Sequence, residues 1–420
     1  MKILIEKIKA EIIKRISRIC ILITLLIIVL SSCNTKPKEK TDEDLKKMAE
    51  KICKENIIID SHIDWPEFIL DNPEDISKRT IKGDFDLIRA DSGGLNAALS
   101  VVYVSTKYGV EEGRIMVDSM MKIIMDYPKK YPAKFAMAKN PDDVKKNFKN
   151  KLFSLPLCLE NGSPIGNELS YLKFLKEKGF VYVTLCHSRT NQISDSNFDE
   201  DRKWKGLSPF GVEVIKEMNR LGLMIDISHS TDSTVFQALR YSKAPIVATH
   251  SSCRYFVPGM ERDLSDTLIK AIAKNKGVVM VNFGSFFLDS ICAKNWRYLH
   301  TQWQDSTGID LDSKEGIDFM LKYGKTHKLF SDVKQVVDHI DHIVKLVGID
   351  YVGIGSDYDG IGQSQPIGLK DVSCYPAIVF ELLKRGYNED DIKKILSGNF
   401  FRVWNEVIEV SKTLDNKTVK

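Results

Sequence analysis

The chain has 420 residues, of which 43% are hydrophobic and 28% are charged, and its formal net charge at pH 7 is +4. This balance is typical of a globular protein and argues against long disordered segments. A net charge this small for this length gives no basis for nucleic acid binding, which we therefore do not expect.

Residues 1–33 have the pattern of an export signal. Six basic residues between Lys2 and Arg18 precede an apolar run over residues 21–30, which is too short for a membrane span of about 20 residues. The run leads into Leu-Ser-Ser-Cys at 30–33, which resembles a bacterial lipoprotein processing site. We expect cleavage before Cys33 and a lipid on its thiol, giving an exported lipoprotein anchored at the periplasmic or outer-membrane face. An uncleaved signal anchor is the alternative.

Residues 34–46 are polar and charged without apolar periodicity, so they are predicted to be a flexible tether. One folded domain is predicted over residues 47–420. Its six cysteines show no metal-like CxxC spacing, and we expect most of them to be buried free thiols.

Eight short β-rich apolar runs recur along this domain, with amphipathic segments between them. They cover residues 57–60, 97–104, 152–158, 180–185, 222–227, 245–249, 277–282 and 351–355. Helices are predicted at 169–178, 211–221, 232–241 and 264–275, among others. Alternating strands and helices indicate a parallel sheet, and eight repeats favour a closed (β/α)8 barrel of the TIM type over an open doubly wound sheet.

Polar side chains able to bind metal follow six of the eight runs. They are His62 and Asp64, Glu160, His187, His229, His250 and Asp357. Barrel enzymes carry their chemistry on the loops after the strands, so these side chains are predicted to converge at one mouth.

Imidazole and carboxylate ligands together suit zinc or a similar divalent ion. His62 and Asp64 offer two ligands from one strand end, His229 and His250 could hold a second ion, and Glu160 could bridge the two. Asp357 can bind metal and also accept the proton of an attacking water. His300 and His327 are predicted to lie on the surface, and His339 and His342 on a helix, in surface or supporting roles.

These residues resemble the membrane dipeptidase family, which includes renal dipeptidase and bacterial relatives. The resemblance covers most of residues 55–410. It is carried by Asp-Ser-His-Ile-Asp at 60–64, Gly-Asp-Phe-Asp-Leu at 83–87, Leu-Glu-Asn-Gly at 159–162, Asp-Ile-Ser-His at 226–229, Thr-His-Ser-Ser at 249–252, the Gly-rich Asp357 segment at 353–360, and Gly-Asn-Phe-Phe-Arg-Val at 398–403.

The resemblance implies an amidohydrolase-like barrel with two Zn²⁺ ions bridged by Glu160. One ion would take His62, Asp64 and Asp357, and the other His229 and His250. It further implies that His187 contacts the scissile carbonyl and that Arg262 receives the substrate's terminal carboxylate. The segment from Gly284 to about Ser331 is longer than the family leads us to expect, and we expect it to cap the pocket.

The predicted function is zinc-dependent hydrolysis of dipeptides by a metal-bridging hydroxide, releasing free amino acids. Two alternatives remain open: a related barrel amidohydrolase acting on a β-lactam or an N-acyl amino acid, and a metal-dependent peptide-binding lipoprotein. Family members are often dimers, so a homodimer is an open alternative to a monomer.

Overall fold

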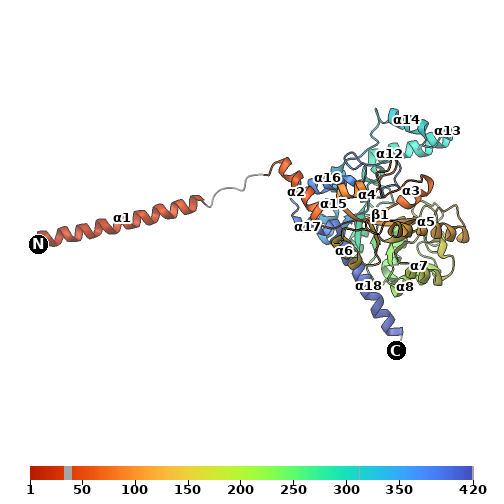
Figure 1. Cartoon of the computed structure of the whole chain (residues 1–420), viewed down its shortest axis with the longest axis horizontal. Helices are drawn as coiled ribbons and strands as arrows, with labels where there is room; N and C mark the ends of the chain where they lie inside the picture. The colour runs from red at the N-terminus through yellow and green to blue at the C-terminus, as the bar shows by residue number, and fades with distance from the viewer. Residues whose placement is uncertain (33–39, 312, 419–420) are drawn as a thin grey trace. The chain divides into compact units, whose positions relative to one another are not determined.

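The computed structural model describes residues 1–32, 40–311 and 313–418 (Figure 1). It comprises two units, Met1–Leu45 and Lys46–Lys420. Helix α1 spans Lys2–Ser32, and the predicted lipidation residue Cys33 lies outside the described residues, as do residues 34–39 of the predicted tether. Within the described chain, no helix has both the length and the apolar character that crossing a membrane requires.

Helix α2 spans Asp42–Glu55, so residues 42–46 are helical rather than part of a flexible tether. The physical reason is a reciprocal cap at its start. Thr41 N donates to Asp44 Oδ2 (3.0 Å), and Asp44 N donates to Thr41 Oγ1 (3.2 Å).

Eight parallel strands follow one another around the second unit, and neighbouring strands are hydrogen-bonded in the order β1, β2, β5, β6, β7, β8, β9, β10. They are β1 (Ile58–Ile63), β2 (Leu95–Tyr103), β5 (Leu157–Glu160), β6 (Phe180–Thr184), β7 (Met224–Asp226), β8 (Val247–Ala248), β9 (Val278–Val281) and β10 (Val352–Ile354). Each lies within or beside one of the eight predicted runs.

The ring closes between β1 and the chain that follows β10. Ile63 and Tyr358 form a parallel bridge, Asp64 N donates to Tyr358 O (2.9 Å), and Asp357 N donates to His62 O (3.0 Å). The predicted (β/α)8 barrel is therefore confirmed, and its closure lies directly beside His62, Asp64 and Asp357.

Two strands extend the sheet outside the ring. β4 (Phe153–Leu155) pairs with β2, and β3 (Phe135–Met137) pairs with β4. Pro156, which has no N–H to donate, separates β4 from β5, so the predicted run 152–158 is two strands rather than one. β3 was not predicted, because three residues are too few to show a periodicity.

The strands contribute to two cores. Ile59, Leu99, Met224 and Met280 belong to one core, together with Trp404 near the start of α18 (Asn399–Thr418). Most of the remaining strand residues pack against the surrounding helices in the larger core. This division follows from the period of two in a strand, which sends neighbouring side chains to opposite faces.

Helices connect the strands and surround the barrel. They are α3 (Trp65–Asp71), α4 (Leu87–Gly93), α5 (Val110–Lys130), α6 (Pro141–Lys149), α7 (Leu169–Lys178), α8 (Pro209–Leu221), α9 (Asp232–Tyr241), α10 (Asp266–Lys274), α15 (Val333–Val347), α16 (Tyr375–Lys384), α17 (Glu389–Lys393) and α18 (Asn399–Thr418). The four predicted helices correspond to α7 to α10. Side-chain caps explain the starts of three of them: Ser208 caps α8, Thr231 caps α9 and Ser265 caps α10.

The long segment after β9 forms a small helical subdomain, which we call the cap. It contains α11 (Ser285–Leu288), α12 (Ser290–Tyr298), a π-helix (Leu299–Gln304), α13 (Asp305–Thr307) and α14 (Lys314–Tyr323). In Figure 1 the labels α12, α13 and α14 lie together at one end of the barrel unit. The cap has its own buried core, which includes Cys292, Trp296, Leu299 and Met320.

The described cysteines form no disulfide. Five of the six cysteines in the barrel unit are buried, namely Cys53, Cys158, Cys186, Cys253 and Cys292. The prediction of buried free thiols is therefore confirmed.

Candidate metal centre

The barrel brings the predicted site residues to one place, at the carboxyl ends of its strands. Three triplets of side chains each hold ligand atoms within 4.8 Å of one another: His62, Asp64 and Glu160; His62, His250 and Asp357; and Glu160, His187 and His229. The triplets share Glu160 and His62, so all seven residues form one cluster. Convergence at the carboxyl ends is the arrangement expected of a barrel enzyme.

Glu160 is the last residue of β5 and lies at the centre of this cluster. Its Oε2 is 3.5 Å from Nε2 of His62, while its Oε1 is 3.2 Å from Nε2 of both His229 and His250. The two oxygens of one carboxylate thus face two different groups of ligands. A carboxylate that bridges two metal ions requires this division.

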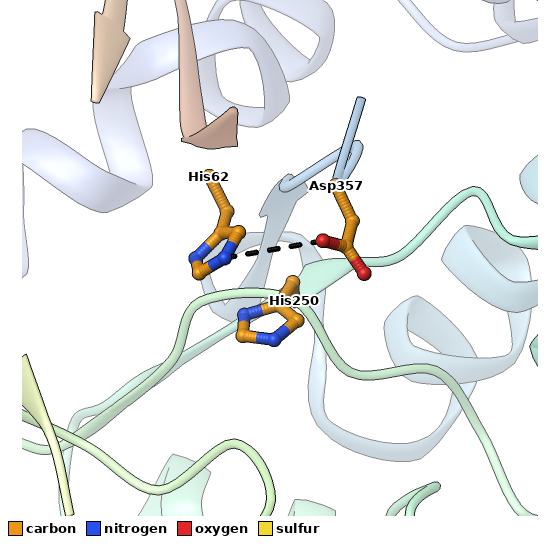
Figure 2. A group of neighbouring side chains, drawn as sticks. All are labelled: His62, His250 and Asp357. Atoms are coloured by element: carbon orange, nitrogen blue, oxygen red, sulfur yellow. Dashed lines mark ion pairs between the residues drawn. The ribbon is translucent and has the colours of Figure 1, made fainter. Parts of the chain in front are cut away.

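Figure 2 shows His62, His250 and Asp357, which come from three different segments and point toward one another. His62 Nε2 lies 3.9 Å from Asp357 Oδ1, and it lies 3.6 Å from Asp64 Oδ2. The imidazole rings of His62 and His250 have centroids 3.7 Å apart. A metal ion that takes His62, Asp64 and Asp357 would therefore find its ligand atoms already gathered.

A hydrogen bond behind His62 directs its free nitrogen toward the cluster. The hydroxyl of Tyr182 donates to Ser61 O (3.1 Å) and contacts His62 Nδ1 at 2.8 Å. Since that hydroxyl has one proton to donate, it accepts from Nδ1–H of His62. Nε2 of His62 then carries the lone pair that a metal needs.

The same argument applies to His250. Thr249 Oγ1 donates to Asp226 Oδ2 (2.7 Å) and contacts His250 Nδ1 at 2.9 Å, so it accepts from Nδ1–H. On the other side of the cluster, Asn282 Nδ2 donates to Asp357 Oδ2 at 2.7 Å and leaves Asp357 Oδ1 facing His62. Both contacts orient ligand atoms that would otherwise rotate.

The cluster has the polar atoms and the charge that a pair of divalent cations would satisfy. Nε2 of His62 and Oδ1 of Asp64 are buried and have no hydrogen-bond partner in the described chain. Three carboxylates, those of Asp64, Glu160 and Asp357, approach one another in the barrel mouth, where buried anions are costly unless they are paired. The residues present therefore fit a dinuclear metal centre.

The pKa values reflect this crowding. Burial, followed by the charges of Glu160 and Asp357, raises the pKa of Asp64 well above its ordinary range. Burial opposes ionisation of Glu160 as well, but the surrounding histidines, His62 first, hold the pKa of Glu160 well below its usual value. Burial lowers the pKa of His229 and of His250, which keeps both imidazoles neutral, the form that binds metal.

The backbone at the cluster is strained. His229 has φ 67° and Asp357 has φ 65°, in the left-handed region that side chains other than glycine seldom adopt. Gly360 is required where it stands, because a Cβ there would lie 2.4 Å from Asp64 Oδ2 and 2.7 Å from Asp357 Oδ1. Such strain is found where a fold holds functional groups in place.

His187 and Arg262, the predicted substrate contacts, lie on the His229 side of the cluster. His187 Nε2 is 4.0 Å from Glu160 Oε1, and its Nδ1 is 3.5 Å from the hydroxyl of Tyr103. Arg262 is buried. It donates from Nη1 to Ser251 Oγ (2.9 Å), and its Nη2 lies 3.2 Å from His229 Nε2. The guanidinium of Arg262 also lies over the ring of Phe287, 5.2 Å from its centroid.

A hollow of about 300 Å³ opens onto the cluster. Besides Asp64, Glu160, His187, His229 and Asp357, it is lined by Glu67, Tyr103, Phe198, Phe286, Phe287, Gly360 and Ile361. Phe286 and Phe287 belong to α11, so the long segment after β9 forms part of the pocket wall. A second hollow, also of about 300 Å³, lies against the cap and shares Phe286, Gly360 and Ile361 with the first.

The remaining histidines lie away from the cluster. His300 and His327 are exposed, as predicted. His339 is fully buried, so a surface role is wrong for it. Its Nδ1 accepts from Cys253 N (2.9 Å), and its Nε2 is 3.1 Å from Leu288 O, which joins α15 to the loop after β8 and to α11. His342 pairs with Asp266 at 2.8 Å.

Sequence reasoning assigned no role to several residues that support the cluster. Tyr182 places a hydroxyl in the middle of a buried apolar strand. A polar group in such a strand was the sequence signal that could have indicated its supporting role. Asn282 follows β9 directly, in the position that identified the other candidates, but an amide is a weaker metal ligand than a carboxylate or an imidazole. Glu67 lies three residues after Asp64, on α3, where only the turn from β1 into α3 brings it to the hollow.

A closed parallel barrel with buried imidazoles and carboxylates at the carboxyl ends of its strands defines a metal-binding enzyme of the (β/α)8 class. The model of the membrane dipeptidase family, Peptidase family M19, matches residues 46–418. The chain therefore belongs to the membrane dipeptidase family and is a metallo-dipeptidase.

Individual relatives agree with this family. Dipeptidase tcpJ of Claviceps purpurea is 29% identical over 367 residues, which cover 84% of this chain and 77% of that protein. The crystal structure of the probable dipeptidase PvdM from Pseudomonas aeruginosa is 26% identical, has a TM-score of 0.77, and covers 88% of this chain and 99% of its own.

A third similarity concerns the fold alone. A metallo peptidase from Rhodobacter sphaeroides, liganded with a phosphinate mimic of the dipeptide L-Ala-D-Ala, is 22% identical with a TM-score of 0.70. The match covers 84% of this chain and 99% of that structure.

Proposed function

We propose that the chain hydrolyses free dipeptides to amino acids with two zinc ions bridged by Glu160. The observation that carries the proposal is the division of the two Glu160 oxygens, one 3.5 Å from His62 and the other 3.2 Å from His229 and His250. The dipeptide mimic bound by the Rhodobacter sphaeroides metallo peptidase, which shares this fold, supports the choice of substrate.

In this proposal His62, Asp64 and Asp357 hold one ion, His229 and His250 hold the other, and Glu160 contributes one oxygen to each. When bound, the two zinc ions would supply a bridging hydroxide as the nucleophile and would polarise the peptide carbonyl. Zinc is the ion that the imidazole-rich donor set suits best.

The protein's own groups would complete the reaction. Asp357, held by Asn282 through Oδ2, accepts the proton of the attacking water and returns it to the leaving amine. His187 lines the hollow next to Glu160 and stabilises the negative charge that develops on the carbonyl oxygen. The guanidinium of Arg262 binds the terminal carboxylate, which restricts the enzyme to substrates with a free carboxyl end.

The test is a panel of L,L and L,D dipeptides, with their C-terminal amides, offered to the full-length chain in detergent with zinc and after chelation. We expect the zinc-loaded chain to cleave dipeptides and chelation to abolish this activity. Asp357→Asn should reduce the activity at least 1000-fold. The C-terminal amides should not be cleaved. Asp126→Asn, which removes an exposed carboxylate on α5, is the matched control and is expected to leave activity unchanged.

Cleavage of a β-lactam or an N-acyl amino acid in place of dipeptides would instead support a related amidohydrolase. Zinc-dependent binding of a dipeptide without release of amino acids would support a peptide-binding lipoprotein. Either result would overturn the proposed reaction.

We also propose that the chain is exported and anchored by a lipid on Cys33, with the barrel on the periplasmic or outer-membrane face. The basic segment, the short apolar run and the Leu-Ser-Ser-Cys sequence at 30–33 support this location. Labelling with an alkyne fatty acid should mark the wild-type chain and not Cys33→Ala, while Cys20→Ala stays labelled. A wild-type chain without label would contradict the anchor.

A homodimer stays part of the proposal, and sedimentation of the detergent-solubilised chain tests it.

A further inference from the structure

Glu67 is an acid in the hollow to which the proposed reaction gives no role. It lies in the first turn of α3, three residues after Asp64, and it lines the hollow together with Asp64, Glu160 and Asp357. The other three carboxylates face imidazoles, and Asp357 also accepts from Asn282. Glu67 is half-buried and makes no hydrogen bond or ion pair within the described chain.

A half-buried carboxylate without a partner is a group that a bound cation would stabilise. The charge of Lys107 acts on Glu67, but Lys107 is exposed and its ammonium lies over the ring of Tyr108. Tyr103 lines the same part of the hollow, and burial, followed by the charges of Glu160 and Glu67, raises the pKa of Tyr103. Glu67 and Tyr103 therefore form an acidic, hydroxyl-bearing wall beyond the metal ligands.

The strand order places this wall across the barrel from Arg262. Glu67 follows β1, and Tyr103 ends β2. Arg262 follows β8 and contacts Ser251, His229 and Phe287, which come after β8, β7 and β9. In the ring of eight strands β2 and β8 are four places apart in either direction. Arg262 itself does not line the hollow, but it contacts His229 and Phe287, which do. A substrate held by its carboxylate at Arg262 would therefore extend over the Glu160 cluster toward Glu67.

We propose that Glu67 binds an ammonium group carried by the N-terminal residue of the substrate. The inference rests on the proposed function, since it takes the substrate to be a dipeptide anchored at Arg262. Two residues span at most about 7 Å, which suits a hollow of this size. The ammonium group could be the α-ammonium of any dipeptide or the side-chain ammonium of an N-terminal lysine.

The experiment compares Glu67→Gln with the wild-type chain, full-length, in detergent and loaded with zinc. The ligands are alanyl-alanine, lysyl-alanine and propionyl-alanine, which lacks the ammonium group. Propionyl-alanine is measured by its inhibition constant against alanyl-alanine, so that it reports whether or not it is cleaved. The zinc content of each protein is measured in parallel.

We expect Glu67→Gln to raise KM for alanyl-alanine about 10- to 100-fold, with kcat and zinc content nearly unchanged, because a charge-assisted hydrogen bond is lost. The inhibition constant of propionyl-alanine should not change, and Glu67→Asp should restore part of the affinity. Equal losses for both dipeptides identify the α-ammonium as the ligand, and a loss confined to lysyl-alanine identifies the side-chain ammonium.

Asp126→Asn is the matched control, because it removes an exposed acid on α5 that does not line the hollow. An unchanged KM for both dipeptides in Glu67→Gln would overturn the inference, as would an equal weakening of propionyl-alanine. Failure of the proposed function is distinguishable, because the zinc-loaded wild-type chain would then cleave neither dipeptide.

Discussion

At the scale of single residues, the candidate metal centre depends on hydrogen bonds that orient the predicted ligand atoms as much as on the predicted ligands themselves. Tyr182 and Thr249 each pass their proton to another acceptor, Ser61 O and Asp226 respectively. Each therefore accepts from an imidazole Nδ1–H and leaves the opposite nitrogen free for metal. The side chains behind the ligands thus define which tautomer the ligands adopt.

Tyr182→Phe tests this arrangement. The variant loses the hydrogen bond to His62 Nδ1 but keeps the packing of the ring, so we expect zinc affinity to fall about 10- to 100-fold. Competition with a chelating dye measures the affinity directly. Tyr171→Phe removes a hydroxyl on α7 that has no hydrogen-bond partner among the described residues, and it should bind zinc like the wild-type chain. Equal affinities in both variants would show that the tautomer of His62 is set elsewhere.

At the scale of elements, the cap is a separate small structure inserted between β9 and α15. Trp296 is 4% exposed in the core of the cap, and its indole N–H donates to Leu329 O at 2.8 Å. Phe286 lines the hollow and also packs against this core. A change in the stability of the cap is therefore expected to change the shape of the pocket.

Trp296→Ala should unfold the cap without unfolding the barrel. Truncation of a buried tryptophan costs about 3–5 kcal/mol, and the small core of the cap would bear all of it. We expect faster hydrogen exchange over residues 290–330 and a higher KM, with zinc content unchanged. Ile291→Ala, on the exposed face of the same helix, should have neither effect. Loss of protection throughout the barrel would contradict the independence of the cap.

His339 makes a second connection between elements, and it is sensitive to pH. Burial lowers the pKa of His339 to about 4, below the ordinary 6.5 of the unfolded chain. As pH falls, the unfolded chain binds the proton first, so stability that is present above about pH 6.5 is lost as pH approaches 4.

Between pH 7 and pH 5 the contribution of His339 to this loss is about 2 kcal/mol. The free energy of unfolding of the metal-free chain is measured with denaturant at both pH values. At pH 7 His339→Asn should be less stable than the wild-type chain, but it should lose less stability than the wild type between pH 7 and pH 5. His327→Asn, at an exposed position, should keep the pH dependence of the wild-type chain. Parallel pH profiles for wild type and His339→Asn would rule out this origin of acid sensitivity.

At the scale of the whole molecule, the barrel brings together charges that repel one another unless cations separate them. Asp64 directly follows β1, Glu160 ends β5 and Asp357 lies in the loop after β10. A metal ion held by these residues would therefore link distant parts of the chain. An ion that binds only the folded state stabilises it by about 2.7 kcal/mol at 100 times its Kd.

Chelation should therefore lower the Tm of the full-length chain by several degrees, and added zinc should restore it. Asp64→Asn is expected to abolish most of this zinc-dependent shift, because one ion loses a ligand. Asp142→Asn, which changes an exposed acid on α6, should retain the full shift. Thermal unfolding with and without zinc measures all three, and an Asp64→Asn chain that responds like the wild type would contradict the ligand role of Asp64.

Much of the fold could be read from the order of residues. The eight barrel strands and helices α7 to α10 were predictable because strand and helix periodicities, cap residues and glycines act over a few neighbouring residues. The same local logic identified the candidate ligands, since each follows a strand. It missed β3, which has only three residues, and it assigned residues 42–46 to a tether because the Thr41–Asp44 cap was overlooked.

By itself, then, the sequence determined the class of fold, the order of the strands and the chemistry gathered at their ends. Only the tertiary structure decided which oxygen of Glu160 faces which histidine, that Tyr182 and Asn282 orient the ligands, that the long segment after β9 builds a cap with its own core, and that Glu67 lines the hollow together with Asp64 and Asp357. The reason is physical. Periodicity and capping are local properties of the chain, whereas contacts across the barrel join residues far apart in the sequence, such as His62 and Asp357, and their geometry exists only once the barrel has closed.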